Sequence, residues 1–111
     1  MIYLVATIEV RRQAEAGFRQ YEARAAAIMA KYGGLIERAI EVDGPAEAES
    51  FVEIHVVRFP DHASLESYRL DPELAALAAM RERAVMATTV VRGRAAPSVD
   101  FAGGLRYSSE V

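Results

Sequence analysis

The chain has 111 residues, of which 52% are hydrophobic, and this suits one domain with a buried core. A formal net charge of −3 with 26% charged residues argues against the basic surface that nucleic acids select. The lack of cysteine excludes disulfides, thiolate metal sites and cysteine nucleophiles. No apolar stretch approaches the length of a membrane span, and the N-terminus lacks the basic start of a signal peptide. We therefore expect a cytoplasmic protein with no membrane partner.

Runs with β-strand character alternate with helical stretches along the chain. The β-rich runs cover residues 2–10, 35–42, 51–59 and 86–92, and the helical stretches cover residues 13–31 and 62–84. The resulting order, β-α-β-β-α-β, is that of a ferredoxin-like domain. We predict an α+β fold with a four-stranded antiparallel sheet in the order 4-1-3-2 and both helices on one face. The first and third strands are placed at the centre because they are the richest in apolar and β-branched residues.

The helical stretches carry their own start and stop signals. In the first, apolar residues recur at spacings of three and four, and the glycine pair at 33–34 ends the helix. Asp61 is a good N-cap for the second stretch. Asp71 followed by Pro72 predicts a fresh start, so we expect a break near residues 70–71. Charged residues of the last segment, such as Arg81, are interpreted as a solvated face.

A sheet with helices on one face leaves its other face open. We expect that face to carry these side chains of strands one and three: Tyr3, Val5, Thr7, Phe51, Val57 and Phe59. Such a patch is too apolar to remain in water, and its burial at roughly 25 cal/mol per Å² favours association. We therefore predict a homodimer, packed sheet to sheet about a two-fold axis. The alternative is a monomer whose tail covers the open face.

The end of the chain differs in composition from the rest. Residues 95–111 contain Pro97, a glycine pair and three serines, as linkers do. We predict a domain over residues 1–94 and a C-terminal tail over residues 95–111. The tail is expected to pack on the domain or on the partner subunit through its large apolar side chains, Phe101, Leu105 and Tyr107.

Short motifs follow one another at regular places in the chain. They are residues 6–10, 32–34, 42–44, 56–60 and 71–74, with Tyr68 and Arg81. Together these motifs, over about residues 1–94, resemble the dimeric α/β-barrel superfamily and most closely its bacterial family called domain of unknown function 1330. The resemblance implies two ferredoxin-like subunits whose sheets form a barrel. The chain departs from the family pattern in having no aromatic residue just after Gly44 and in having Leu74 where a second tyrosine is common.

Two histidines are the natural groups for proton transfer near neutral pH. Glu53 precedes His55 by two residues, so both side chains share one strand face, which we expect to lie between the subunits with Thr7 and Glu9 nearby. There His55 and Glu53 are the candidate catalytic pair for taking a proton from a small substrate. The alternative is a polar contact across the dimer. His62 is expected to be an exposed residue in the first turn of a helix.

A ligand site is the other candidate. Tyr3 and Thr7 on the first strand, with Phe18 and Tyr21 on the first helix, are the candidate ligand-binding residues, although helical spacing also suits a plain core. The histidine spacing matches no metal-ligand motif, so we expect neither a metal nor another cofactor. We predict a protein that binds a small apolar or aromatic metabolite. The alternatives are a cofactor-independent monooxygenase or isomerase of the antibiotic-biosynthesis type, which the resemblance implies, and a non-catalytic structural dimer.

Overall fold

The computed structural model describes residues 1–97, and its elements follow the predicted order. The strands are β1 (Ile2–Arg11), β2 (Leu35–Glu41), β3 (Ser50–Phe59) and β4 (Val85–Gly93). A short 3-10 helix, η1 (Arg12–Ala14), leads into α1 (Glu15–Ala30), and the later helices are α2 (His62–Arg69), α3 (Pro72–Ala75) and α4 (Ala78–Ala84). The expected contacts of Phe101, Leu105 and Tyr107 lie outside the described residues.

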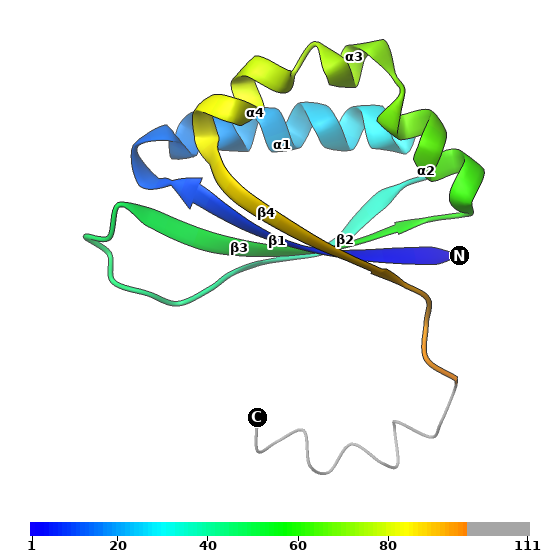
Figure 1. Cartoon of the computed structure of the whole chain (residues 1–111), viewed down its shortest axis with the longest axis horizontal. Coiled ribbons are helices and arrows are strands. Elements are labelled where there is room, and N and C mark those ends of the chain that lie inside the picture. The colour runs from blue at the N-terminus through cyan, green and yellow to red at the C-terminus, as the bar shows by residue number, and fades with distance from the viewer. Residues whose placement is uncertain (98–111) are drawn as a thin grey trace.

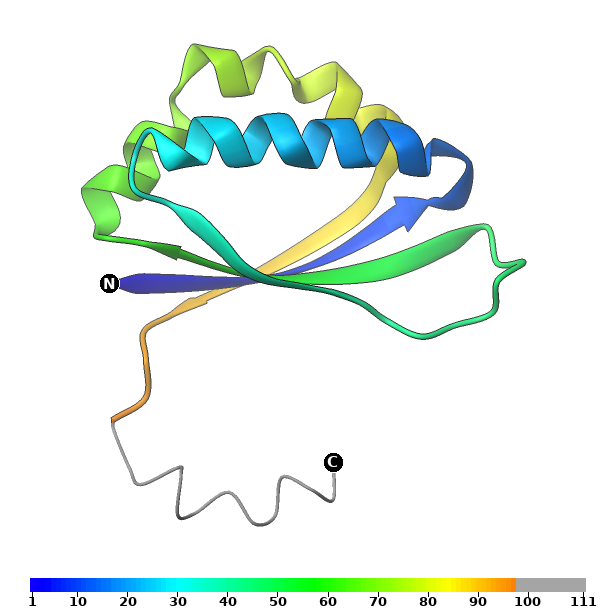
Figure 2. The same cartoon turned by 180° about the vertical axis from the view of Figure 1, so that it is seen from behind.

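The four strands form one antiparallel sheet in the order β2-β3-β1-β4. Read from the other edge, this is the predicted order 4-1-3-2, with β1 and β3 at the centre. All the helices lie over one face of the sheet (Figure 1), and within residues 1–97 the opposite face carries no helix (Figure 2). The predicted ferredoxin-like fold is therefore confirmed.

The second helical stretch breaks where the sequence predicts. Asp61 Oδ1 accepts a hydrogen bond from the Ser64 amide at 2.8 Å at the start of α2, and α2 ends at Arg69. Asp71 then caps α3, accepting from the Glu73 amide at 2.7 Å, with proline next in the chain. None of the helices within residues 1–97 is both long and apolar enough to cross a membrane.

The aromatic face of β3 lies under the helices. We expected Phe51, Val57 and Phe59 on the open face of the sheet, and this is wrong. All three are buried in the core, where Phe51 packs with Phe18 and the other two pack with Leu65. Both faces of β3 are apolar in part, and the larger side chains fill the deeper space beneath α1 and α2.

The uncovered face of the sheet carries branched side chains instead of phenylalanines. The register places Val56 opposite Val5 and Ile54 opposite Thr7, so the smaller residues of β3 face outward. Tyr3, Val5 and Thr7 lie on this face as predicted. We call it the open sheet face, and it includes Tyr3, Val5, Thr7, Ile40, Ile54, Val56 and Val91.

Strand β2 changes face within its length. Its register with β3 shifts between Ile36 and Arg38, so one strand has an extra residue at that point. Ile36 therefore lies beside Val57 under the helices, whereas Ile40 lies opposite Ile54 on the open sheet face. A regular strand would place both isoleucines on one face, because they are four residues apart, and the bulge reverses this alternation.

Candidate functional site

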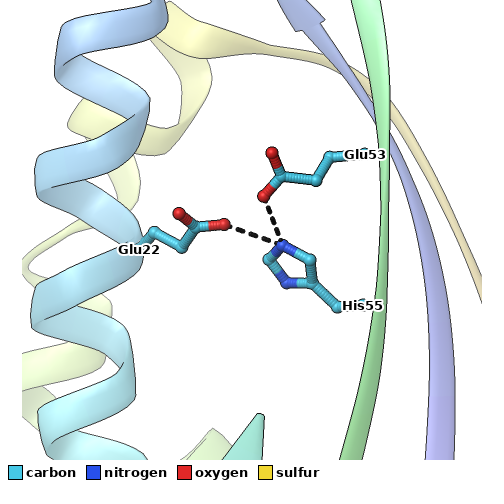
Figure 3. A group of neighbouring side chains, drawn as sticks. All are labelled: Glu22, Glu53 and His55. Atoms are coloured by element: carbon cyan, nitrogen blue, oxygen red, sulfur yellow. Dashed lines mark hydrogen bonds and ion pairs between the residues drawn. The ribbon is translucent and has the colours of Figure 1, made fainter. Parts of the chain in front are cut away.

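A histidine and two glutamates meet between α1 and β3 (Figure 3). Nε2 of His55 lies 2.7 Å from Oε1 of Glu53 and 2.7 Å from Oε2 of Glu22. His55 and Glu53 come from alternate positions of β3, and Glu22 reaches them from α1. The two strand residues are buried and Glu22 is half-buried. We call these three side chains the His55 cluster.

The His55 cluster lies on the helix-covered side of the sheet. His55 pairs with Ala6 in the register, and both face the helices. The expectation that His55 and Glu53 lie between subunits beside Thr7 and Glu9 is therefore wrong, since Thr7 and Glu9 lie on the opposite face. For the same reason, the two residues contact each other within one chain instead of across a dimer.

Arg19 closes the cluster on its outer side. Its Nη1 lies 2.6 Å from Oε2 of Glu53 and 3.2 Å from Oε1 of Glu22. Its Nη2 lies 3.3 Å from Oε1 of Glu41 and 3.5 Å from Oε2 of Glu15. The pairs with Glu15 and Glu41 are exposed and therefore weak. The contact with buried Glu53 is the one whose loss would leave a carboxylate without a partner inside the protein.

The three titratable groups shift one another's pKa values. Burial lowers the pKa of His55, but the hydrogen bonds and charges of the two carboxylates outweigh it and raise that pKa above its ordinary 6.5. Burial and the neighbouring Glu22 raise the pKa of Glu53. Burial works against the charged form of Glu22, but its contacts with the ring of His55 and the guanidinium of Arg19 lower its pKa to about 2.

The contacts of His55 fix which ring nitrogen carries the proton. Both partners of Nε2 are carboxylate oxygens, and ionised carboxylates only accept hydrogen bonds, so Nε2 donates in the neutral ring as well as in the charged one. The lone pair of the neutral ring is then on Nδ1, which faces away from both carboxylates (Figure 3). Within residues 1–97, Nδ1 has no hydrogen-bond partner. It is therefore the nitrogen that can accept a proton from another molecule.

The same three side chains form the group best placed to hold a metal ion in the described part of the chain. Their ligand atoms lie within 4.8 Å of one another. However, Arg19 already contacts both carboxylates, and Nε2 of His55 lies 2.7 Å from an oxygen of each. The Arg19 guanidinium balances one of the two negative charges, and the imidazolium form of His55 balances the other. This charge balance favours a proton over a divalent cation at the centre of the cluster.

A cavity of about 340 Å³ lies beside His55, between the sheet and the helices. Phe18, Tyr21 and Glu22 line it together with His55, and most of its wall is apolar, contributed by Leu4, Ala6, Ile8, Ala25, Met29, Ile36, Val57, Leu65, Leu74, Val85 and Val90. A larger depression of about 540 Å³ lies between α1 and α3 and contains the exposed Lys31–Glu73 ion pair. The cavity beside His55 is the candidate site because it combines enclosure with groups that exchange protons.

The structure separates the predicted ligand residues into two sets. Phe18 and Tyr21 line the cavity, whereas Tyr3 and Thr7 lie on the open sheet face. Sequence reasoning missed Glu22, which it placed off the apolar stripe of α1. A signal for it was present, since Glu22 follows Phe18 by four positions and so falls on the same helix face.

The fold and the site define a small ferredoxin-like α+β protein with a buried histidine–carboxylate cluster beside an apolar cavity. The chain belongs to the family described as domain of unknown function (DUF1330), whose profile matches residues 1–94. The family predicted from the sequence motifs is thereby confirmed. A comparison with curated proteins finds no match.

Solved structures show the same fold in proteins of distant sequence. A protein of unknown function from Rhodopseudomonas palustris has a TM-score of 0.69 and 14% identity, over 87% of this chain and 83% of that chain. SnoaB, a cofactor-independent oxygenase from Streptomyces nogalater, has a TM-score of 0.61 and 19% identity, over 89% of this chain and 97% of that chain. An uncharacterised NIPSNAP domain protein from Burkholderia xenovorans has a TM-score of 0.64 and 15% identity, over 90% and 97% of the two chains. At such identities the likeness concerns the fold alone.

Proposed function

We propose that this protein binds a small apolar or aromatic metabolite in the cavity between the sheet and the helices. The observation that carries the proposal is a cavity of about 340 Å³ with apolar walls and His55 at its side. Cavities that hold small molecules are typically about 300–1,000 Å³, with mostly apolar walls and a few convergent polar groups. Burial of the ligand's apolar surface would supply affinity at roughly 25 cal/mol per Å².

A second candidate function is proton transfer to and from the bound molecule. It is favoured by Nδ1 of His55, whose lone pair is available in the neutral ring, in which Nε2 donates its proton to Glu53. His55 would take a proton from the ligand as a general base, and the two carboxylates would stabilise the imidazolium that forms. This chemistry suits a cofactor-independent isomerase or monooxygenase, because both begin by removing a proton from the substrate. SnoaB, described as a cofactor-independent oxygenase, shares the fold at 19% identity.

We also propose that two copies pair through the open sheet face. Its exposed apolar side chains support this, since Val5 is 40% exposed, Ile40 is 48% exposed and Val91 is 63% exposed in the single chain. A contiguous apolar surface of this kind favours association with another protein surface. The open sheet face and the ligand cavity lie on opposite sides of the sheet. A non-catalytic structural dimer would therefore form through the open sheet face and would not require a ligand in the cavity.

Isothermal titration with 2-naphthol tests the binding proposal. Ala6 lines the cavity and Thr7, the next residue, faces the other side of the sheet. Ala6→Leu fills the cavity and is expected to weaken binding by at least about tenfold. The matched variant Thr7→Leu is expected to bind like wild type. Absence of binding to the wild-type protein, or equal binding by both variants, would contradict the proposal.

Deuterium exchange into 2-tetralone, an aromatic ketone with acidic C–H bonds, tests the proton-transfer candidate. His55→Ala is expected to reduce any catalysed exchange by about a hundredfold or more, because general-base catalysis contributes roughly 10²–10⁴. His62→Ala serves as the control, since that side chain is 62% exposed at the start of α2. A His55→Ala variant that exchanges as fast as wild type would remove His55 as the base. Exchange no faster than in buffer would contradict the proton-transfer candidate, and ligand binding would remain the only proposed function of the cavity.

A further inference from the structure

One arginine lines the cavity without a carboxylate partner. Arg81 of α4 is half-buried, and its Nη2 donates a hydrogen bond to Oγ1 of Thr88 at 2.7 Å. Within the described part of the chain, Arg81 makes no ion pair. A half-buried guanidinium has lost part of its hydration, so an unbalanced charge at this position is costly. A negatively charged partner therefore stabilises this guanidinium more than it would stabilise a fully solvated one.

The groups around Arg81 do not supply that negative charge. Tyr21 and Tyr68 also line the cavity, and both keep their phenolic protons at neutral pH. Burial raises the pKa of Tyr21 although Arg81 opposes it, and burial raises the pKa of Tyr68 to about 12. The one carboxylate that lines the cavity belongs to Glu22, which is engaged by His55 and Arg19.

A second arginine beside the cavity is already balanced. Arg69 of α2 lies 3.3 Å from Glu66, and its side chain is 49% exposed. Arg69 therefore adds positive potential near the cavity, but a negatively charged ligand would stabilise it less than it would stabilise Arg81. The cavity thus has an apolar interior, and one part of its wall carries the positive charge of Arg81 with no carboxylate partner among the described residues.

We propose that the ligand is a small organic anion, with an apolar or aromatic body in the cavity and a carboxylate bound by Arg81. The guanidinium offers paired N–H donors in a plane, a shape that matches a carboxylate and gives short, charge-assisted hydrogen bonds. The inference rests on the proposed ligand-binding function and specifies the class of ligand. Arg81 is thus the residue that selects for charge, while the apolar walls select for shape.

Two probes of nearly equal shape test this selection. 2-Naphthoate carries a carboxylate, and 2-naphthamide replaces it with a neutral amide. Isothermal titration at neutral pH is expected to give roughly tenfold or more tighter binding of 2-naphthoate to the wild-type protein, because hydrogen bonds to charged groups are the stronger ones. Arg81→Gln should abolish the preference while keeping the binding of 2-naphthamide. Arg81→Lys should retain part of it.

Arg83→Gln is the matched control, since Arg83 lies on the same helix, is exposed and does not line the cavity. It should leave the preference intact. Equal affinity of the wild-type protein for the two probes, a comparison that needs no variant, would overturn the anion proposal while leaving the proposed function standing. Binding of neither probe would overturn both. A preference for 2-naphthoate that Arg81→Gln leaves unchanged would show that another group selects the charge.

Discussion

The guanidinium of Arg19 on α1 lies 2.6 Å from the carboxylate of Glu53 on β3. The Glu53 side chain is 3% exposed and that of Arg19 is 39% exposed, so a charge inside the protein is balanced by one at its surface. The same carboxylate holds the Nε2 proton of His55. One ion pair thus ties α1 to the sheet and also sets the protonation of the candidate base.

Replacing Arg19 should destabilise the fold through Glu53. Arg19→Met removes the cation and leaves a buried carboxylate facing Glu22, and we expect it to lower the free energy of unfolding by about 2 kcal/mol. This is less than the cost of breaking a fully buried pair, roughly 3–5 kcal/mol, because water reaches Arg19. Urea unfolding measures the change. Arg24→Met is the control, since Arg24 is exposed on the same helix, and similar losses in both variants would argue against the role of the buried pair.

The stabilising effect of His55 should depend on pH. Its pKa in the folded protein is raised above 6.5, so the charged ring contributes stability that is fully present below about pH 6.5. That contribution is lost as the pH rises through the raised pKa of the folded state. We expect wild type to exceed His55→Gln by about 1–3 kcal/mol at about pH 6 and by less at about pH 9, as measured by urea unfolding. A difference that does not change with pH would show that the ring charge is not linked to folding.

Two glycines should respond to alanine in opposite directions. A Cβ atom at Gly34 would lie 2.5 Å from Cε1 of Phe59 and would also meet Met29, both parts of the core. We therefore expect Gly34→Ala to destabilise the protein by about 1–3 kcal/mol. At Gly17 in α1 a Cβ atom would meet nothing within 4 Å, so Gly17→Ala should stabilise by about 0.5–1 kcal/mol. A melting temperature that rises in Gly34→Ala would contradict this account of packing at Gly34, and one that falls in Gly17→Ala would contradict the account of open space at Gly17.

A charge on the open sheet face should prevent pairing of subunits. We expect the wild-type protein to have the mass of a dimer at micromolar concentration by light scattering, and Val5→Lys to have that of a monomer, because a buried unpaired lysine is costly. Leu70→Lys is the control, since Leu70 is 79% exposed just after α2, away from the sheet. A monomeric wild type would refute the proposed dimer, and a dimeric Val5→Lys would place the interface elsewhere.

Local signals in the sequence were enough to predict the order of elements. The alternation in residues 2–10 indicates a strand whatever packs against it, and the glycine pair at 33–34 ends α1 because glycine lacks a Cβ atom. Asp71 and Pro72 mark the break between α2 and α3 because the cap and the ring act on neighbouring backbone atoms. Each of these features depends on residues close together in the chain, so one sequence is sufficient to find it.

Which face of β3 meets the helices could not be predicted in this way. Alternation separates Val56 from Val57 but does not say which of them is inside, because both faces carry apolar residues. The reversal in β2 could not be predicted either, since a bulge after Ile36 leaves no pattern in the sequence. These assignments depend on the register with β1 and on the space beneath the helices.

The sequence by itself determined the fold class, the order of the strands and the histidine–glutamate pair on β3. Only the tertiary structure decided that Glu22 and Arg19 join this pair, and that Arg81 lines the cavity instead of a solvated face. The physical reason is that secondary structure follows from contacts over a few residues. Electrostatic partners are instead set by distances between elements far apart in the chain. The sequence does not distinguish a charged side chain that faces water from one that faces a buried group.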